Sequence, residues 1–226
     1  MTTISQRLQD TLAAIHAAKT AALVTHAVHL LAVSKAQSAE AIREAALMGQ
    51  VAFGENYVQE AIEKQLLLND LTLDWHFIGP IQSNKTQLIA KHFSWVHGID
   101  RLKIAQRLHD ARVATLPPLQ VCIQVNVSHE DSKAGVNLDE VETLARQIQD
   151  LPHLALRGLM TIPEPTEDVN VQHQQFKLLR QCYDKLKAQG FKLDTLSMGM
   201  SNDFAVAIAE GATIVRIGSA LFGARV

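Results

Sequence analysis

The sequence predicts an α/β protein folded as a single (β/α)8 barrel. The first observation behind this prediction is that short apolar runs, of the length typical of buried strands, recur along the 226 residues. The second is that a helix-forming segment follows these runs, so strands and helices alternate. The third is that no stretch rich in Pro, Gly or Ser divides the chain, which indicates one domain over residues 1–226. A doubly wound open sheet is the main alternative, because counting strands does not distinguish it from a barrel.

The elements of the first half begin with a helix over residues 5–19, whose leucines and isoleucine recur on one face. Residues 26–35 contain the first strand, because this run is short, apolar on both faces and without helical periodicity. Ser38 is expected to cap the next helix, which ends at residue 48 before Gly49. Three further strand and helix pairs are expected at residues 51–54 and 57–68, at 74–79 and from 83 onward, and at 93–97 and 100–111.

In the second half, residues 119–127 form the longest and clearest expected strand, directly after two prolines. Asn137 and Glu140 have the spacing of a capping pair and open a helix that runs to residue 149. A strand at 154–160 and a long helix at 169–188, ended by Gly190, come next. The last expected elements are a strand at 193–196, a helix from Ser201 that Gly211 ends, and a strand at 213–217.

Composition and charge argue against several classes of protein. The net charge is −2 and no basic run occurs, so the chain lacks the electrostatic pattern of a nucleic-acid-binding protein. Cys122 and Cys182 are far apart, and His76 and His97 lie in separate strands, so neither pair predicts a disulfide framework or a metal site. The N-terminus lacks the apolar core of a signal peptide, and no apolar run reaches membrane-spanning length. We expect a soluble, cytoplasmic monomer that binds no metal, nucleic acid or membrane.

Lys35 is the first candidate functional residue, because it ends the apolar run of the first strand. The carboxyl ends of parallel strands are where α/β folds build their sites. Partial desolvation there favours the neutral amine, which can attack an aldehyde to form a Schiff base. The alternative is a lysine that only carries the chain into solvent.

The loops after the last two expected strands supply a second candidate feature. Ser201 on one loop, and Gly218 and Ser219 on the other, combine small residues with hydroxyls where a helix begins, which favours a phosphate. Arg216 lies in an otherwise apolar strand just before the second loop, so it needs a partner, either a carboxylate or a ligand atom. A Schiff-base lysine, a phosphate cradle and an inward arginine together describe a site for pyridoxal 5′-phosphate (PLP).

A set of motifs runs in one order from about residue 30 to 223. They are Leu31-Ala32-Val33-Ser34-Lys35, Phe53-Gly54-Glu55-Asn56, His76-Phe77-Ile78-Gly79, Gln82-Ser83-Asn84-Lys85, Gln124-Val125-Asn126, Lys133-Ala134-Gly135, Gly158-Leu159-Met160-Thr161-Ile162-Pro163, Ser197-Met198-Gly199-Met200-Ser201 and Val215-Arg216-Ile217-Gly218-Ser219-Ala220-Leu221-Phe222-Gly223. In these motifs the chain resembles the YggS/PROSC-type pyridoxal phosphate homeostasis proteins. The resemblance implies a barrel like the N-terminal domain of alanine racemase.

The resemblance also implies roles for particular residues. Lys35 would hold PLP as a Schiff base, Arg216 would face the pyridine nitrogen, and Asn56 would line the pocket. Ser201, Gly218 and Ser219 would bind the phosphate. With Met200 beside them, the expected cofactor-binding set is Lys35, Asn56, Met200, Ser201, Arg216, Gly218 and Ser219, and no catalytic residue is expected. Ala36 and Gln37 depart from the threonine and basic residue that often follow the family's lysine.

The family resemblance implies a protein that buffers and delivers PLP, with PLP-dependent apoenzymes as recipients and no catalytic turnover. Racemisation needs a second acid or base opposite the lysine, and the only tyrosines, Tyr57 and Tyr183, lie in expected helices. The alternatives are a PLP-dependent racemase-like enzyme and an aldolase that uses Lys35 without a cofactor. Lys85 and Lys133 lie on loops of the site face, either as attractants for an anionic ligand or as solvated surface lysines.

Overall fold

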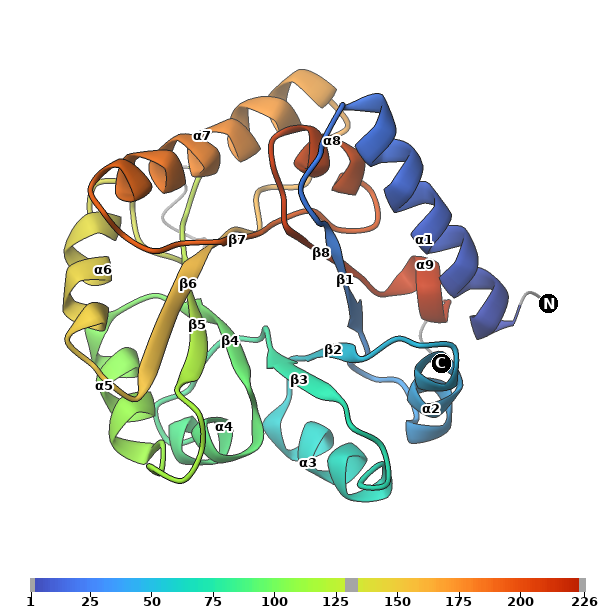
Figure 1. Cartoon of the computed structure of the whole chain (residues 1–226), viewed down its shortest axis with the longest axis horizontal. Helices are drawn as coiled ribbons and strands as arrows, with labels where there is room; N and C mark the ends of the chain where they lie inside the picture. Colours follow the sequence, from blue (N-terminus) through green and yellow to red (C-terminus); the bar gives the residue numbers. More distant parts are fainter. Residues whose placement is uncertain (1–2, 129–133, 224–226) are drawn as a thin grey trace.

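The fold is a closed barrel of eight parallel strands surrounded by helices, seen in a computed structural model that describes residues 3–128 and 134–223. The strands are β1 (His29–Val33), β2 (Ala52–Glu55), β3 (Asp74–Phe77), β4 (Trp95–Ile99), β5 (Leu119–Gln124), β6 (Leu154–Met160), β7 (Thr195–Ser197) and β8 (Ile214–Ile217). They follow one another around the barrel in chain order, which Figure 1 shows from the end of the barrel. The barrel prediction is therefore confirmed.

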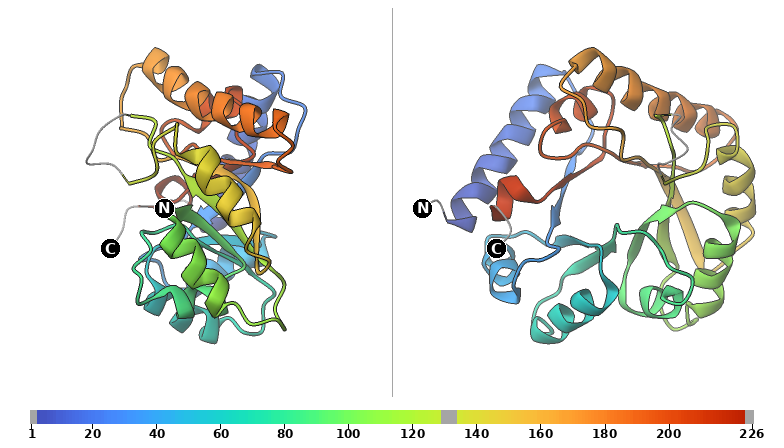
Figure 2. Two further views of the ribbon diagram at one scale, coloured as in Figure 1. Left: turned by 90° about the vertical axis from the view of Figure 1, so that its left-hand side faces the viewer. Right: turned by 180° about the vertical axis from the view of Figure 1, so that it is seen from behind.

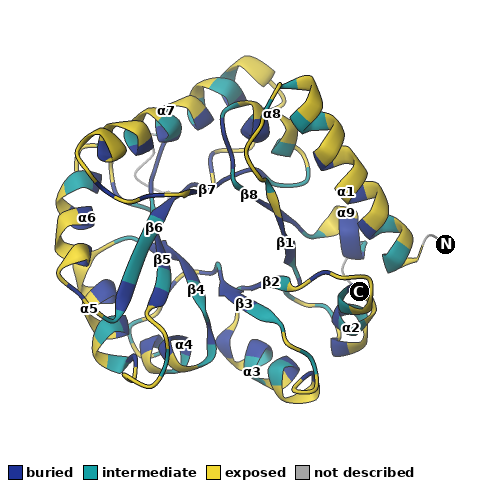
Figure 3. Ribbon diagram, in the orientation of Figure 1, coloured by how far each residue is buried: buried dark blue, intermediate teal, exposed yellow. Residues whose placement is uncertain are grey.

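The helices lie outside the strands on all sides, as the view from behind in Figure 2 also shows. They are α1 (Ile4–Ala21), α2 (Ala39–Leu47), α3 (Val58–Leu67), α4 (Thr86–His92), α5 (Leu102–Ala111), α6 (Val141–Gln149), α7 (Val169–Ala188), α8 (Phe204–Ala209) and α9 (Ser219–Phe222). Each turns its apolar side to the barrel, so burial in Figure 3 is concentrated on the strands and on the inner faces of the helices. Within the described residues, no helix is long and apolar enough to cross a membrane.

Closure depends on the pairing of β1 with both β2 and β8. Ala32 is paired with Phe53 of β2 on one side and with Ile217 of β8 on the other. The pairing of β8 back onto β1 rules out the open-sheet alternative, because the eight strands follow one another in chain order and none of them is left as an edge. It also brings the carboxyl end of the first strand next to that of the last.

Element boundaries differ from the prediction at a few points. The Ser38 cap is confirmed, since its side chain accepts a hydrogen bond from the Ala41 backbone. Strand β5 ends at Gln124 because Val125 makes only an isolated bridge to Val136. The one-turn helix α9 was not predicted, because four residues are too few for a periodic signal.

Candidate functional site

Lys35 lies two residues beyond the end of β1, at the rim where the strands end. Its neighbour across the rim is the loop after β8. A Cβ atom on Gly218 would lie 3.1 Å from the carbonyl oxygen of Val33, closer than most Cβ contacts, so the two backbones approach closely at this glycine. The barrel thus brings the Lys35 loop and the Gly218–Ser219 loop together, as the sequence analysis expected.

A buried ion pair fixes the backbone around Lys35. Lys64 of α3 donates through Nζ to the carbonyl oxygen of Ser34 at 2.7 Å and to Oε1 of Glu55 at 2.8 Å. The Ser34 hydroxyl donates to the same Glu55 oxygen at 2.6 Å. On the other side of Lys35, the backbone N–H of Ala36 donates to Oε1 of Glu60 at 2.6 Å, and Glu60 in turn pairs with Lys64. Ser34 is therefore held by both α3 and β2, and Ala36 is held by α3.

This cluster of Glu55, Glu60 and Lys64 was missed by the sequence analysis. Burial raises the pKa of Glu55 above its ordinary value, although Lys64 and the Ser34 hydroxyl oppose the shift. Ala36 adopts a φ of 57°, a left-handed conformation that is uncommon outside glycine and that the Glu60 contact holds in place. The i, i+4 spacing of Glu60 and Lys64 was the one available signal in the sequence.

Asn56 follows β2 at the same rim, and its side-chain oxygen is an unsatisfied hydrogen-bond acceptor. The Oδ1 atom is buried and has no hydrogen-bond partner among the residues that the structure describes. Gly79, after β3, packs on the Asn56 backbone, where a Cβ would lie 2.5 Å from the Asn56 carbonyl oxygen. An orphaned buried amide oxygen of this kind is stabilised when a ligand supplies a donor.

The loops after β7 and β8 bring two hydroxyls together. The hydroxyl of Ser219 donates to that of Ser201 at 3.4 Å. Ser201 does not open the next helix, contrary to the prediction. The helix α8 begins at Phe204, and Asp203 accepts a hydrogen bond from the Met200 backbone N–H at 2.5 Å, which turns residues 201–203 into a tight loop. Ser201 thus lies on the loop before α8 and Ser219 opens α9, both at the end of the barrel where Lys35 follows β1.

Arg216 is buried in the barrel and held by neutral groups. Its Nη1 donates to the carbonyl and hydroxyl oxygens of Ser197, at 2.6 and 2.9 Å, and its Nη2 donates to the Thr161 carbonyl oxygen at 2.7 Å. Among the described residues no carboxylate forms an ion pair with it. Burial lowers the pKa of Arg216 to about 10, with Asp203 opposing the shift at longer range. A buried cation without an ion pair favours an anionic ligand.

Two other predicted features fall outside this arrangement. Tyr57 precedes α3 rather than lying in it and is exposed, whereas Tyr183 is buried in α7 and donates its hydroxyl to the Leu193 carbonyl oxygen at 2.9 Å. Lys85 precedes α4, and Lys133 lies outside the described residues. Within the described chain, no cluster of three or more His, Cys, Asp or Glu side chains suits a metal ion.

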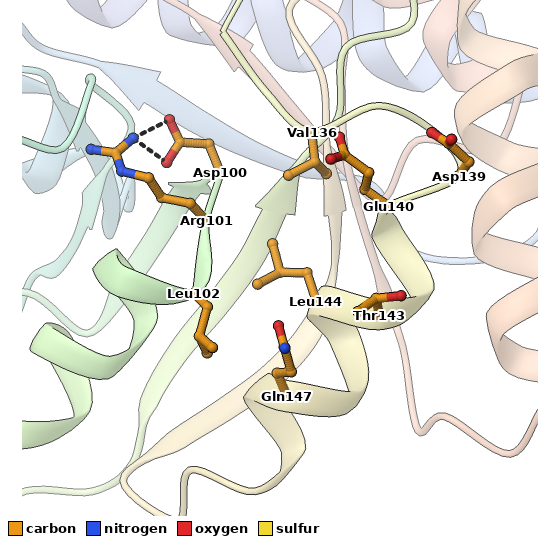
Figure 4. Close-up of a pocket in the computed structure, with 9 residues that line it drawn as sticks. All are labelled: Asp100, Arg101, Leu102, Val136, Asp139, Glu140, Thr143, Leu144 and Gln147. Atoms are coloured by element: carbon orange, nitrogen blue, oxygen red, sulfur yellow. Dashed lines mark hydrogen bonds and ion pairs between the residues drawn. The ribbon is translucent and has the colours of Figure 1, made fainter.

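A separate pocket of about 310 Å³ lies on the outside of the barrel between the amino-terminal ends of α5 and α6 (Figure 4). Its lining includes the carboxylates of Asp100, Asp139 and Glu140, and Arg101 donates to Asp100 at 2.7 Å. None of the predicted cofactor-binding residues lines it. The excess of carboxylates disfavours a phosphate, so the rim described above remains the candidate site.

The chain is similar to known proteins over nearly its whole length. Residues 10–226 match the family described as alanine racemase, N-terminal domain. A protein of Pseudomonas aeruginosa named pyridoxal phosphate homeostasis protein is 56% identical over 226 residues, which cover 100% of this chain and 97% of the relative. A protein of the same name from Escherichia coli K12 is 52% identical over 199 residues, 87% of this chain and 85% of the relative.

Solved structures agree with this likeness. PipY of Synechococcus elongatus, described as having PLP bound, is 38% identical with a TM-score of 0.83, and the match covers 97% of this chain and 100% of PipY. Alanine racemase of Corynebacterium glutamicum has a TM-score of 0.73 at 18% identity, with 98% of this chain and 61% of that enzyme covered. The likeness to alanine racemase extends to the fold alone.

Proposed function

Because the chain belongs to the family of pyridoxal phosphate homeostasis proteins, we propose that it binds PLP at the rim formed by β1, β2, β7 and β8. The observation that carries this proposal is the closure of β8 onto β1, which brings the Lys35 loop beside the Gly218–Ser219 loop. Lys35 is the amine that the aldehyde of PLP requires. Its Nζ would hold the cofactor by a C=N bond to the aldehyde carbon, with the aldehyde oxygen lost as water.

The remaining residues fit the other functional groups of the cofactor. Ser201 and Ser219 supply hydroxyl donors for the phosphate, and the loops of Met200 and Gly218 bring the backbone close to it. The orphaned oxygen of Asn56 supports a role in holding a hydroxyl donor of the ligand. Arg216 would compensate negative charge and would be the residue toward the pyridine nitrogen. We treat residues 1–226 as one PLP-binding domain.

We further propose that the protein carries PLP without catalytic turnover. Bound PLP acts as an electron sink most effectively when its ring nitrogen is protonated. Arg216 keeps its own proton at neutral pH, since its pKa stays near 10 even when buried. The Tyr183 hydroxyl donates its hydrogen bond to the Leu193 carbonyl oxygen, so Tyr183 does not supply a second acid or base at the rim. These features support a carrier rather than an enzyme. We propose that it acts as a cytoplasmic monomer that buffers PLP and passes it to PLP-dependent apoenzymes.

A racemase-like activity is the second candidate function, favoured by the fold shared with alanine racemase. The test is to incubate purified protein with PLP, remove free cofactor, and record the visible absorbance of the wild type beside Lys35→Ala. Lys85→Ala is the matched control at the same face. We expect a visible band in the wild type and control only, and no racemisation of an amino-acid panel by the same samples. A band that persists in Lys35→Ala contradicts the proposed attachment, and turnover contradicts the carrier function.

A further inference from the structure

A continuous chain of hydrogen bonds crosses the interior of the barrel and ends at Arg216. Asp74 at the start of β3 contacts Nε2 of His76 through Oδ2 at 3.0 Å. Nδ1 of His76 lies 2.9 Å from Nε2 of His97 in β4. Nδ1 of His97 lies 2.8 Å from the hydroxyl oxygen of Ser197 in β7, which accepts from Nη1 of Arg216 in β8. The chain therefore connects the two ends of the barrel.

The donor at each link can be assigned from the two ends of the chain. Arg216 can only donate, so the Ser197 oxygen accepts from it and the Ser197 hydroxyl is free to donate to Nδ1 of His97. His97 then carries its proton on Nε2 and donates to Nδ1 of His76. His76 in turn carries its proton on Nε2 and donates to Asp74, whose carboxylate can only accept. With both rings neutral, every link has one donor and one acceptor.

The surroundings of His97 support the neutral form of its ring, and packing holds both rings in place. His97 is fully buried, and burial together with His76 and Arg216 lowers its pKa well below the ordinary value. His76 is also buried, and its ring stacks on that of Trp95 with centroids 5.3 Å apart and an interplanar angle of 4°. Stacking and burial fix the orientation of the rings. The donor and acceptor at each hydrogen bond can therefore exchange only if the proton of each ring moves between Nε2 and Nδ1.

Asp74 is the carboxylate at the end of this chain of hydrogen bonds. Among the described residues, the other nearby carboxylates are Asp194, which is paired with Arg157 below Trp95, and Asp203, which binds the Met200 backbone. Neither carboxylate forms a hydrogen bond with His76 or His97. Burial raises the pKa of Asp74, but the hydrogen bond and electrostatic interaction with His76, together with the hydrogen bond from Ser94, outweigh it and lower the pKa overall. Asp74 is thus the group that sets the direction of the chain.

We infer that His76 and His97 are positioning residues for the proposed PLP site, and that Asp74 fixes through them the hydrogen-bonding state of Ser197 and Arg216. Rotation of the Ser197 hydroxyl toward His97 leaves its lone pairs facing Arg216, which holds the guanidinium in one orientation toward the ligand. This inference rests on the proposed binding of PLP, but the hydrogen-bond chain itself belongs to the protein without cofactor.

Asp74→Asn is the decisive variant, because the asparagine amide can donate to Nε2 of His76, which the carboxylate cannot do. Its oxygen can still accept from Ser94, which contacts the other carboxylate oxygen of Asp74. The chain then reverses: His76 and His97 carry their protons on Nδ1, and Ser197 receives N–H groups from both His97 and Arg216. Glu210→Gln is the matched control, because it removes a carboxylate that binds His173 at 2.7 Å on the outer helices.

The first readout is nitrogen-15 NMR of the imidazole rings at neutral pH in the protein without PLP. We expect both rings to carry the proton on Nε2 in the wild type and in Glu210→Gln, and on Nδ1 in Asp74→Asn. His97 with the same protonated nitrogen in Asp74→Asn as in the wild type would overturn the inference. This readout is independent of whether PLP binds, so it separates failure of the chain from failure of the proposed function.

The second readout is the Kd for PLP, measured by equilibrium dialysis. Asp74→Asn and His97→Phe should each weaken binding about tenfold, the loss expected for one hydrogen bond of about 1.4 kcal/mol, while Glu210→Gln leaves it unchanged. Asp74 is partly exposed, so its variant should fold even if His97→Phe does not. Altered rings in Asp74→Asn together with an unchanged Kd would overturn the positioning role.

Discussion

The substitution Lys64→Met tests whether the buried ion pair beside the site stabilises the protein. Lys64 is almost fully buried and donates to three oxygens, those of Ser34, Glu55 and Glu60, at 2.7, 2.8 and 2.6 Å. Methionine keeps most of the volume but leaves the fully buried Glu55 carboxylate without its cation. Removing one partner of such a pair costs about 3–5 kcal/mol of unfolding free energy, a large share of the ~5–15 kcal/mol available to a typical domain.

The assay is urea unfolding followed by the fluorescence of the two tryptophans, at neutral pH. Adding Glu55→Gln to Lys64→Met should recover more than half of the lost free energy, because the neutral amide removes the uncompensated charge. The matched control is Lys103→Met on the exposed side of α5, which should change stability by no more than about 0.5 kcal/mol. A Lys64→Met variant as stable as the control would refute the reasoning, as would a double variant less stable than the single one.

Three further predictions concern other parts of the chain. Gly158→Ala should cost about 3 kcal/mol or more in urea unfolding, because the new Cβ would lie 1.7 Å from the Thr195 carbonyl oxygen; a wild-type midpoint would contradict this packing. Hydrogen bonds from Gln189 and then from neighbouring cations lower the pKa of Glu142 to about 2, below its ordinary 4.5. The stability it contributes is present above pH 4.5 and lost as the pH falls toward 2, so Glu142→Gln should flatten this part of the acid unfolding profile, and an unchanged slope would count against the pairing. Burial raises the pKa of Cys122 to about 12, so a thiol reagent at pH 8 should label it only after unfolding; rapid labelling of the folded protein would show that the barrel interior is accessible.

The barrel was predictable because its evidence is local in the sequence. Each buried strand is a short apolar run, and each helix has a cap or a periodic apolar face, such as Ser38 before α2. The Ser201 boundary failed for a local reason too. The backbone N–H groups of Asp203 and Phe204 donate to the Met200 carbonyl oxygen, and the Asp203 side chain accepts from the Met200 N–H, so residues 201–203 form a turn and the helix begins at Phe204. A sequence pattern places a helix start only to within a few residues.

The interior contacts were not predictable, because they depend on which strands are neighbours and on their register. His76 and His97 are 21 positions apart and were treated as unrelated, yet adjacent strands bring their ring nitrogens to 2.9 Å. The link from His97 to Ser197 spans 100 positions across the barrel. Lys35 and Ser219 could be assigned to one rim because strand ends in a barrel share an edge, whereas side-chain pairing inside requires the register itself.

The most direct test of the central claim is to locate the attached cofactor. The protein is incubated with PLP and reduced with borohydride, which converts the C=N bond into a stable amine, and its peptides are analysed by mass spectrometry. We predict that the added mass lies on the peptide containing Lys35 and is absent from Lys35→Ala. Attachment to another lysine, such as Lys64 or Lys85, or no attachment at all, would contradict the assignment of this rim as the PLP site.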